Sequence, residues 1–187
     1  MDFHGQHIVV TGGSSGIGLV TARLLAGRGA RVSLIARRKK LLDEAVAAMG
    51  EHSAGFAADV GDKAQLDGAI EAAAAHFGPV HGLFANAGLT GGFTPAVAFD
   101  PVVFEETIRV NLISVFWAIQ KVLPAMIEAR NGVILVTGSM ACQAYCRAPS
   151  RHARDPLGTW PRDTSERRPT LRLTILACHE TVTRQSQ

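Results

Sequence analysis

Apolar residues in the first two-thirds of the chain form short continuous runs that alternate with longer stretches of three- and four-residue periodicity. A continuous apolar run favours a buried strand, whereas the longer period favours a helix with one apolar face. The runs predict strands over residues 6–11, 31–36, 55–59, 80–85 and 133–137. The periodic stretches predict helices over residues 16–28, 39–49, 63–77 and 101–129.

The predicted strands are apolar along most of their length rather than alternating with polar residues. This pattern is typical of parallel strands that are covered by helices on both faces. Strands that alternate with helices in this way build an α/β fold with an open, doubly wound parallel sheet. We therefore expect a ligand crevice at the carboxyl ends of the strands, where the strand order reverses.

The longest predicted helix, over residues 101–129, has a clear beginning and one apolar face. Asp100 is a suitable N-cap, and Pro101 fits the first helical position. Pro124 predicts a kink near the end of this helix, because proline removes a backbone hydrogen bond.

The sequence changes character after about residue 142. Four prolines between residues 149 and 169 exclude a long helix there, and neither lysine nor an apolar period is present. Residues 170–178 can form a short strand that pairs with the fifth strand. We expect one folded domain over residues 1–141 and a divergent, poorly ordered tail over residues 142–187.

The 187-residue chain is 47% hydrophobic, which predicts a single domain with a sizeable core. Its formal net charge of +3 divides into −1 for residues 1–146 and +4 for residues 147–187. The arginines of the tail are scattered among prolines rather than arranged in a stripe, so we expect no nucleic-acid partner. An arginine-rich nucleic-acid binder is the alternative, and its affinity would depend on salt and on the tail.

No stretch approaches the roughly 18 uninterrupted apolar residues that span a bilayer, so we expect no membrane partner. The first strand begins within a few residues of Met1, which leaves no room for a secretory signal. Cys142, Cys146 and Cys178 fit free thiols better than a disulfide framework or a zinc site. These features predict a cytoplasmic protein without a metal.

The junction between the first predicted strand and the first predicted helix carries the most informative motif. It reads Thr11-Gly12-Gly13-Ser14-Ser15-Gly16-Ile17-Gly18. Glycines allow the backbone to turn tightly and approach a pyrophosphate, and the helix N-terminus attracts the anion. Glycine also marks ordinary turns, but the strand before it and the helix after it favour a phosphate site.

A second motif, Asn86-Ala87-Gly88, follows the fourth predicted strand. A Thr-Gly-x-x-x-Gly-x-Gly turn together with this Asn-Ala-Gly resembles the short-chain dehydrogenase/reductase family, over roughly residues 5–141. The resemblance implies a Rossmann-like sheet that is incomplete at its C-terminal side, because a full member continues with another helix and further strands. It also implies hydride transfer between a nicotinamide cofactor and a carbonyl or alcohol carbon.

The resemblance implies three groups of cofactor contacts: the diphosphate loop, the adenine pocket and the nicotinamide side of the crevice. In that order the residues are Gly12, Ser14, Ser15, Gly16, Ile17 and Gly18; Asp59 and Val60; and Asn86, Ala87 and Gly88. Two alternatives stay open. Asp59 can instead cap a loop or helix, and the Asn-Ala-Gly motif can instead stabilise the central sheet.

The choice of cofactor depends on Ala36-Arg37-Arg38, at the end of the second predicted strand. An acidic residue there would bind a ribose 2′-hydroxyl and repel a phosphate. Two guanidinium groups can instead bind a 2′-phosphate through several donors. We predict NADP rather than NAD, with Arg37 as the main determinant and Arg38 beside it. The alternative is a solvated basic run over residues 37–40.

The catalytic set of the family is Asn, Ser, Tyr and Lys. Asn111 matches by its place in the long helix, and Ser139 matches by its place at the end of the fifth strand. The alternative roles are a buried, hydrogen-bonded amide for Asn111 and an N-cap or turn serine for Ser139. The only tyrosine, Tyr145, is the candidate catalytic acid. It lies six residues after Ser139, and four residues later the chain has Pro149 rather than lysine. A free phenol has a pKa of about 10, so catalysis near neutrality needs a nearby cation.

Two hypotheses for function follow. The first is an NADP-dependent oxidoreductase acting on a small-molecule alcohol or carbonyl substrate. The second is a non-catalytic dinucleotide-binding pseudoenzyme, or a truncated fragment, because the Tyr-x-x-x-Lys pair is missing. Members of the family associate through the long helix, which implies a homo- or hetero-oligomer through residues 101–129.

Overall fold

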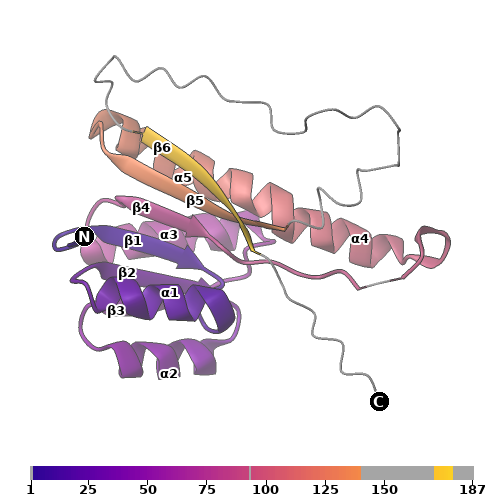
Figure 1. Cartoon of the computed structure of the whole chain (residues 1–187), viewed down its shortest axis with the longest axis horizontal. Coiled ribbons are helices and arrows are strands. Elements are labelled where there is room, and N and C mark those ends of the chain that lie inside the picture. The colour runs from indigo at the N-terminus through magenta and orange to yellow at the C-terminus, as the bar shows by residue number, and fades with distance from the viewer. Residues whose placement is uncertain (1, 93, 140–170, 179–187) are drawn as a thin grey trace.

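The computed structural model describes residues 2–92, 94–139 and 171–178. Within them, six parallel strands form one sheet in the order β3-β2-β1-β4-β5-β6 (Figure 1). The strands are β1 (His7–Thr11), β2 (Arg31–Ala36), β3 (Ser53–Ala57), β4 (Gly82–Ala85), β5 (Gly132–Ser139) and β6 (Leu171–Cys178). The strand order reverses between β1 and β4, as a doubly wound sheet requires.

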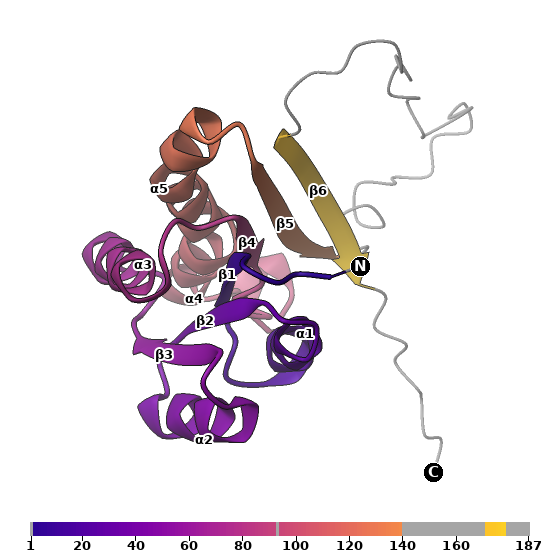
Figure 2. The same cartoon turned by 90° about the vertical axis from the view of Figure 1, so that its left-hand side faces the viewer.

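Helices cover both faces of the sheet, with α1 and α2 on one face and α3 and α5 on the other (Figure 2), while α4 extends beyond the ends of the strands (Figure 1). Their bounds are α1 (Gly16–Ala26), α2 (Lys39–Met49), α3 (Lys63–Phe77), α4 (Pro101–Ile108) and α5 (Ser114–Glu128). A five-residue π-helical segment, η2 (Arg109–Ile113), joins α4 to α5, and a short 3-10 turn, η1 (Ala96–Ala98), precedes α4. The predicted α/β class and parallel sheet are therefore confirmed.

Each face of the sheet has its own hydrophobic core, because successive side chains of a strand point to opposite faces. Val9 of β1 packs with α3 and α5, whereas its neighbour Val10 packs with α1 and α2. Leu83 and Phe84 of β4 divide in the same way. All four side chains are almost fully buried, which explains why the strands are apolar rather than alternating.

The main differences between the structure and the sequence prediction concern two elements, and the other bounds shift by one or two residues. The third strand is Ser53–Ala57 rather than residues 55–59, so Asp59 lies in the loop after the strand. There the Asp59 carboxylate accepts a hydrogen bond from the Gly61 amide (2.9 Å), which turns the chain. The second difference is in the long helix, whose regular hydrogen bonding changes at η2, whereas α5 continues past Pro124 to Glu128.

Residues 170–178 were predicted to add a short strand beside the fifth, and β6 confirms this pairing. Its register with β5 runs from Gly132 opposite Leu171 to Ser139 opposite Cys178. β6 thus belongs to the same sheet, although it lies beyond residue 141, where the first domain was predicted to end.

In the part of the chain that the structure describes, Pro101–Glu128 is the helical stretch long and apolar enough to cross a membrane. Its most apolar window has a mean hydropathy of 1.5 and is 28% buried. Length and composition alone are weak support for a span, because core helices share them. Ala118, Val122 and Met126 of this stretch are buried in the core shared with α3.

His7 is the largest polar side chain in the core and is fully buried. Its Nδ1 lies 2.8 Å from the Gly78 carbonyl oxygen, and its Nε2 lies 2.8 Å from the Ser33 hydroxyl. A neutral imidazole satisfies both, since Nδ1–H donates to the carbonyl and Nε2 accepts from the hydroxyl. Burial lowers the pKa of His7 below its ordinary value of 6.5.

This lowered pKa predicts that the protein loses stability in mild acid. The unfolded chain binds a proton at His7 at a higher pH than the folded chain does, so stability falls as the pH drops below 6.5. We expect the urea midpoint of His7→Asn to decline less than that of the wild type between pH 7.5 and 5. The control is His52→Gln, at an exposed histidine, which should show the same decline as the wild type. Equal slopes in wild type and His7→Asn would contradict this assignment.

Candidate functional site

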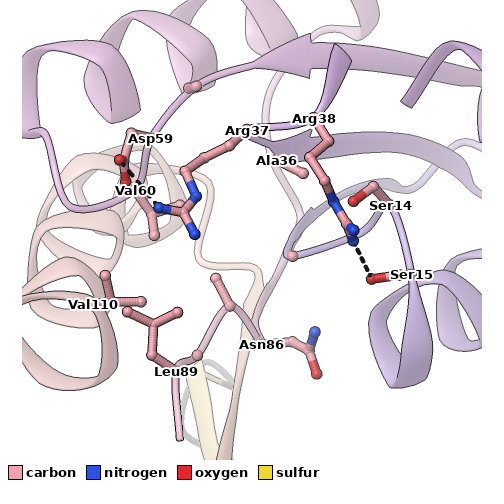
Figure 3. Close-up of a pocket in the computed structure, with 14 residues that line it drawn as sticks. Ser14, Ser15, Ala36, Arg37, Arg38, Asp59, Val60, Asn86, Leu89 and Val110 are labelled. Carbon is pink, nitrogen blue, oxygen red and sulfur yellow. Dashed lines mark hydrogen bonds and ion pairs between the residues drawn. The ribbon is translucent and has the colours of Figure 1, made fainter. Parts of the chain in front are cut away.

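A cavity of about 400 Å³ opens at the carboxyl ends of the central strands (Figure 3). Its wall is built from the loops that follow β1, β2, β3 and β4, together with one residue of η2. The lining residues are Gly12, Ser14, Ser15, Ala36, Arg37, Arg38, Ala58, Asp59, Val60, Asn86, Ala87, Gly88, Leu89 and Val110. The volume is within the usual range for a small-molecule or cofactor site.

The floor of this cavity is fixed by hydrogen bonds around Asn86. The Thr11 hydroxyl oxygen accepts from the backbone amides of Asn86 (3.0 Å) and Ala87 (3.1 Å). The Asn86 side chain donates to the Thr11 carbonyl (3.3 Å) and accepts from the Thr137 hydroxyl (3.1 Å). One side chain therefore connects β1, β4 and β5 where their carboxyl ends meet.

The glycine-rich loop, over residues 11–18, lies directly against the turn over residues 86–88, called here the Asn86 turn. Gly12 has a φ of +67°, and a Cβ there would lie 2.9 Å from the Ala87 Cα. A Cβ on Gly18 would lie 2.6 Å from both the Asn86 Nδ2 and the Gly12 carbonyl oxygen. These contacts leave no room for a side chain, so glycine is required at both positions for the two loops to pack.

The N-terminus of α1 points its backbone amides at this loop. Ser15 is the N-cap, but its side chain makes no capping hydrogen bond and no acidic residue stands in the first turn. The first intrahelical backbone bond runs from the Leu19 amide to the Ser15 carbonyl (3.3 Å). The amides of Gly16, Ile17 and Gly18 therefore have no intrahelical acceptor, which is the arrangement that binds anions.

Two adjacent arginines occupy opposite sides of the cavity (Figure 3). Arg38 extends toward the glycine-rich loop, where its Nη2 donates to the Ser15 hydroxyl oxygen (3.1 Å). Arg37 extends toward β3, and its Nη1 lies 3.7 Å from the Asp59 Oδ2 and 3.8 Å from the Glu106 Oε1 of α4. The two cations thus face different surroundings, one a hydroxyl and the other two carboxylates.

The predicted cofactor residues divide into a lining group and a supporting group. Gly16, Ile17 and Gly18 do not line the cavity, although their amides lie in the first turn of α1. The other predicted residues line it: Gly12, Ser14, Ser15, Arg37, Arg38, Asp59, Val60, Asn86, Ala87 and Gly88. Asp59 and Asn86 also hold loops by hydrogen bonds, so the structural alternatives weighed for them coexist with a place in the cavity wall.

Asn111 lies in η2 and holds the loop that follows β4. Its Oδ1 accepts from the Leu89 amide (2.7 Å), and its Nδ2 donates to the Leu89 carbonyl (2.8 Å). The side-chain amide therefore pairs with the backbone of a residue that lines the cavity. This contact positions the loop, and a catalytic contribution by Asn111 stays a prediction.

The other two predicted catalytic residues are placed less fully. Ser139 is the last residue of β5, opposite Cys178 of β6. Tyr145 lies outside the described residues. Among those residues, no group of three or more His, Cys, Asp or Glu side chains is arranged to hold a metal ion.

Sequence reasoning missed several residues that shape the site. Leu89 and Ala58 adjoin predicted motifs, so their position next to Gly88 and Asp59 could have indicated them. Val110 and Glu106 belong to the helical stretch after the fourth strand, and only the fold brings Val110 to the cavity wall and Glu106 to Arg37.

Comparison with known proteins identifies the family. The family model for short chain dehydrogenase matches residues 6–150, so the chain belongs to this family. Levodione reductase of Leifsonia aquatica is 34% identical over 143 residues, which are 74% of this chain and 54% of that protein. Cyclohexanol dehydrogenase of an Acinetobacter species is 33% identical over 143 residues, 74% of this chain and 57% of that protein.

Solved structures agree with the family assignment. A 3-ketoacyl-(acyl-carrier-protein) reductase from Brucella melitensis, complexed with NADH, matches with a TM-score of 0.73 at 30% identity. That match covers 75% of this chain and 60% of the reductase. NAD⁺-bound xylitol dehydrogenase matches with a TM-score of 0.72 at 30% identity, over 75% of this chain and 55% of that one. The chain spans little more than half the length of these relatives.

The contact between the glycine-rich loop and the Asn86 turn predicts opposite effects on stability when two helical glycines, Gly18 and Gly68, are replaced by alanine. Gly18→Ala should lower the free energy of unfolding by about 1–3 kcal/mol, because its methyl group meets the Gly12 backbone and Asn86. Gly68→Ala in α3 is the matched control. Nothing lies within 4 Å of its Cβ, so it should raise stability by about 0.5–1 kcal/mol. Urea unfolding measures both, and equal effects would contradict the packing described.

Proposed function

We propose that this chain binds a nicotinamide dinucleotide in the cavity and is an oxidoreductase of the short-chain type. The observation that carries the proposal is the junction of the glycine-rich loop, the Asn86 turn and the uncapped N-terminus of α1. A close backbone approach and free helix amides suit a diphosphate. Relatives bound to NADH and NAD⁺ support the same ligand class.

In this proposal the cavity residues have separate roles. The amides of Gly16, Ile17 and Gly18 hold the diphosphate, and Ser14 and Ser15 stand beside it. Val60, Ala58 and Val110 form an apolar surface for the adenine, with the Asp59 carboxylate as a polar neighbour. The backbone from Asn86 to Leu89 lines the nicotinamide side, held in place by Asn111.

We further propose NADP(H) as the preferred cofactor. Arg37 and Arg38 both reach the cavity at the end of β2, and no carboxylate stands at position 36, 37 or 38. Guanidinium groups bind a 2′-phosphate through several charge-assisted hydrogen bonds. Arg38 is the closer of the two to the glycine-rich loop, through its bond to Ser15.

This proposal predicts that Arg38→Ala weakens NADPH binding by about tenfold and NADH binding by less, since a hydrogen bond to a charged group is lost. Lys40→Ala is the matched control, because it removes one exposed positive charge two residues further along the chain. Fluorescence titration of the full chain with each nucleotide measures the effect. The assignment fails if the two variants lose NADPH affinity equally.

The proposed substrate is a small-molecule alcohol or carbonyl compound, as in levodione reductase and cyclohexanol dehydrogenase. The bound nicotinamide would supply the hydride acceptor or donor. Ser139 at the end of β5 is the residue proposed to hold the substrate oxygen, and Tyr145 is the proposed acid.

One observation favours a second function, that of a non-catalytic dinucleotide-binding module. Tyr145 is the only tyrosine, the fourth residue after it is Pro149, and the last lysine is Lys121. The tyrosine therefore lacks the lysine that would lower its pKa in a working pair. Turnover assays with a panel of alcohols and ketones separate the two functions. NADPH-dependent turnover supports the oxidoreductase, whereas binding without turnover supports the module.

We also propose that the chain associates with a second subunit through α4 and α5, as a protein of the cytoplasm. This stretch carries large apolar side chains that are more than half exposed: Val102, Phe104, Leu112, Phe116 and Ile127. Large exposed apolar surface is typical of a protein contact.

A further inference from the structure

A carboxylate from a distant part of the chain faces the arginine that was predicted to select the cofactor. Glu106 lies on α4, yet its Oε1 is 3.8 Å from the Arg37 Nη1 at the end of β2. The same nitrogen lies 3.7 Å from the Asp59 Oδ2. Arg37 therefore extends to the Asp59 side of the cavity, whereas Arg38 extends toward Ser15 (Figure 3).

Taken over both sides of the cavity, the charges of the two arginines and the two carboxylates balance. Arg37 and Arg38 supply two positive charges, and Asp59 and Glu106 supply two negative charges. A 2′-phosphate carries about two negative charges near neutral pH, so it would compete with both carboxylates for the Arg37 guanidinium. A free ribose 2′-hydroxyl carries no charge and meets no such competition.

The two carboxylates are not equivalent. The Asp59 Oδ1 already accepts from the Gly61 amide, so this side chain is part of the loop after β3. Glu106 is 53% exposed on the surface of α4, and among the described residues its one ion-pair partner is Arg37. Glu106 can therefore be changed without removing a loop contact, which makes it the adjustable member of the group.

We infer that Glu106 is a specificity-determining residue, which acts through Arg37 to reduce the preference for NADP(H) over NAD(H). This inference rests on the proposed nucleotide binding. It assigns to α4 a part in cofactor choice, in addition to the end of β2.

The test measures dissociation constants of the full chain for NADPH and NADH by fluorescence titration. Glu106→Gln should raise the ratio of NADH to NADPH dissociation constants about two- to fivefold, which is the range for a half-exposed ion pair. Glu106→Lys should shift the ratio further in the same direction. Glu105→Gln is the matched control, because its neighbouring exposed carboxylate makes no ion pair with Arg37 in the described residues, so the ratio should not change.

A third comparison tests whether the effect passes through Arg37. In the Arg37→Ala background, Glu106→Gln should leave the ratio unchanged. The inference is overturned if Glu106→Gln has no effect, if Glu105→Gln matches it, or if its shift persists without Arg37. Failure of the wild-type chain to bind either nucleotide overturns the proposed function itself, and the inference with it, before any variant is compared.

Discussion

One side chain, that of Asn86, connects the carboxyl ends of the paired strands β1, β4 and β5. Its amide bonds to the Thr11 carbonyl and the Thr137 hydroxyl, while Thr11 accepts from the backbone at Asn86 and Ala87. These groups are partly removed from water, where an unmade hydrogen bond costs about 1–3 kcal/mol. The backbone ladders set the spacing of the central strands, and this network fixes the turn at Asn86 against the end of β1.

The cavity follows from that constraint. With the Asn86 turn fixed, the glycine-rich loop can reach it only if positions 12 and 18 carry no side chain. The close packing places the start of α1, which has no side-chain cap, directly after the loop residues that line the cavity. Electrostatics then divide the wall into an amide-rich end beside Arg38 and an end where Arg37 faces two carboxylates. The first end suits the diphosphate that nicotinamide dinucleotides share, and the proposed choice between dinucleotides involves the arginines at both ends.

The sequence predicted those parts of the molecule that local patterns encode. The strand over 31–36 and the helix over 39–49 were placed correctly, because burial fixes the period of their apolar residues. The role of Asn111 was less accessible: its spacing gave its place in the helix, but the loop backbone that it binds is brought there by the fold. The pairing of Arg37 with Glu106 had no local signal at all, because the charge balance at a cavity depends on packing between distant elements.

The central claim is that free main-chain amides at the start of α1 hold a nucleotide's phosphates. Hydrogen exchange on the full chain, with and without saturating NADPH, tests it most directly. The account predicts slower exchange at Gly16, Ile17 and Gly18, with little change in α2, which lies outside the lining of the cavity. Unchanged exchange at these three amides, in protein that has demonstrably bound NADPH, would contradict the account.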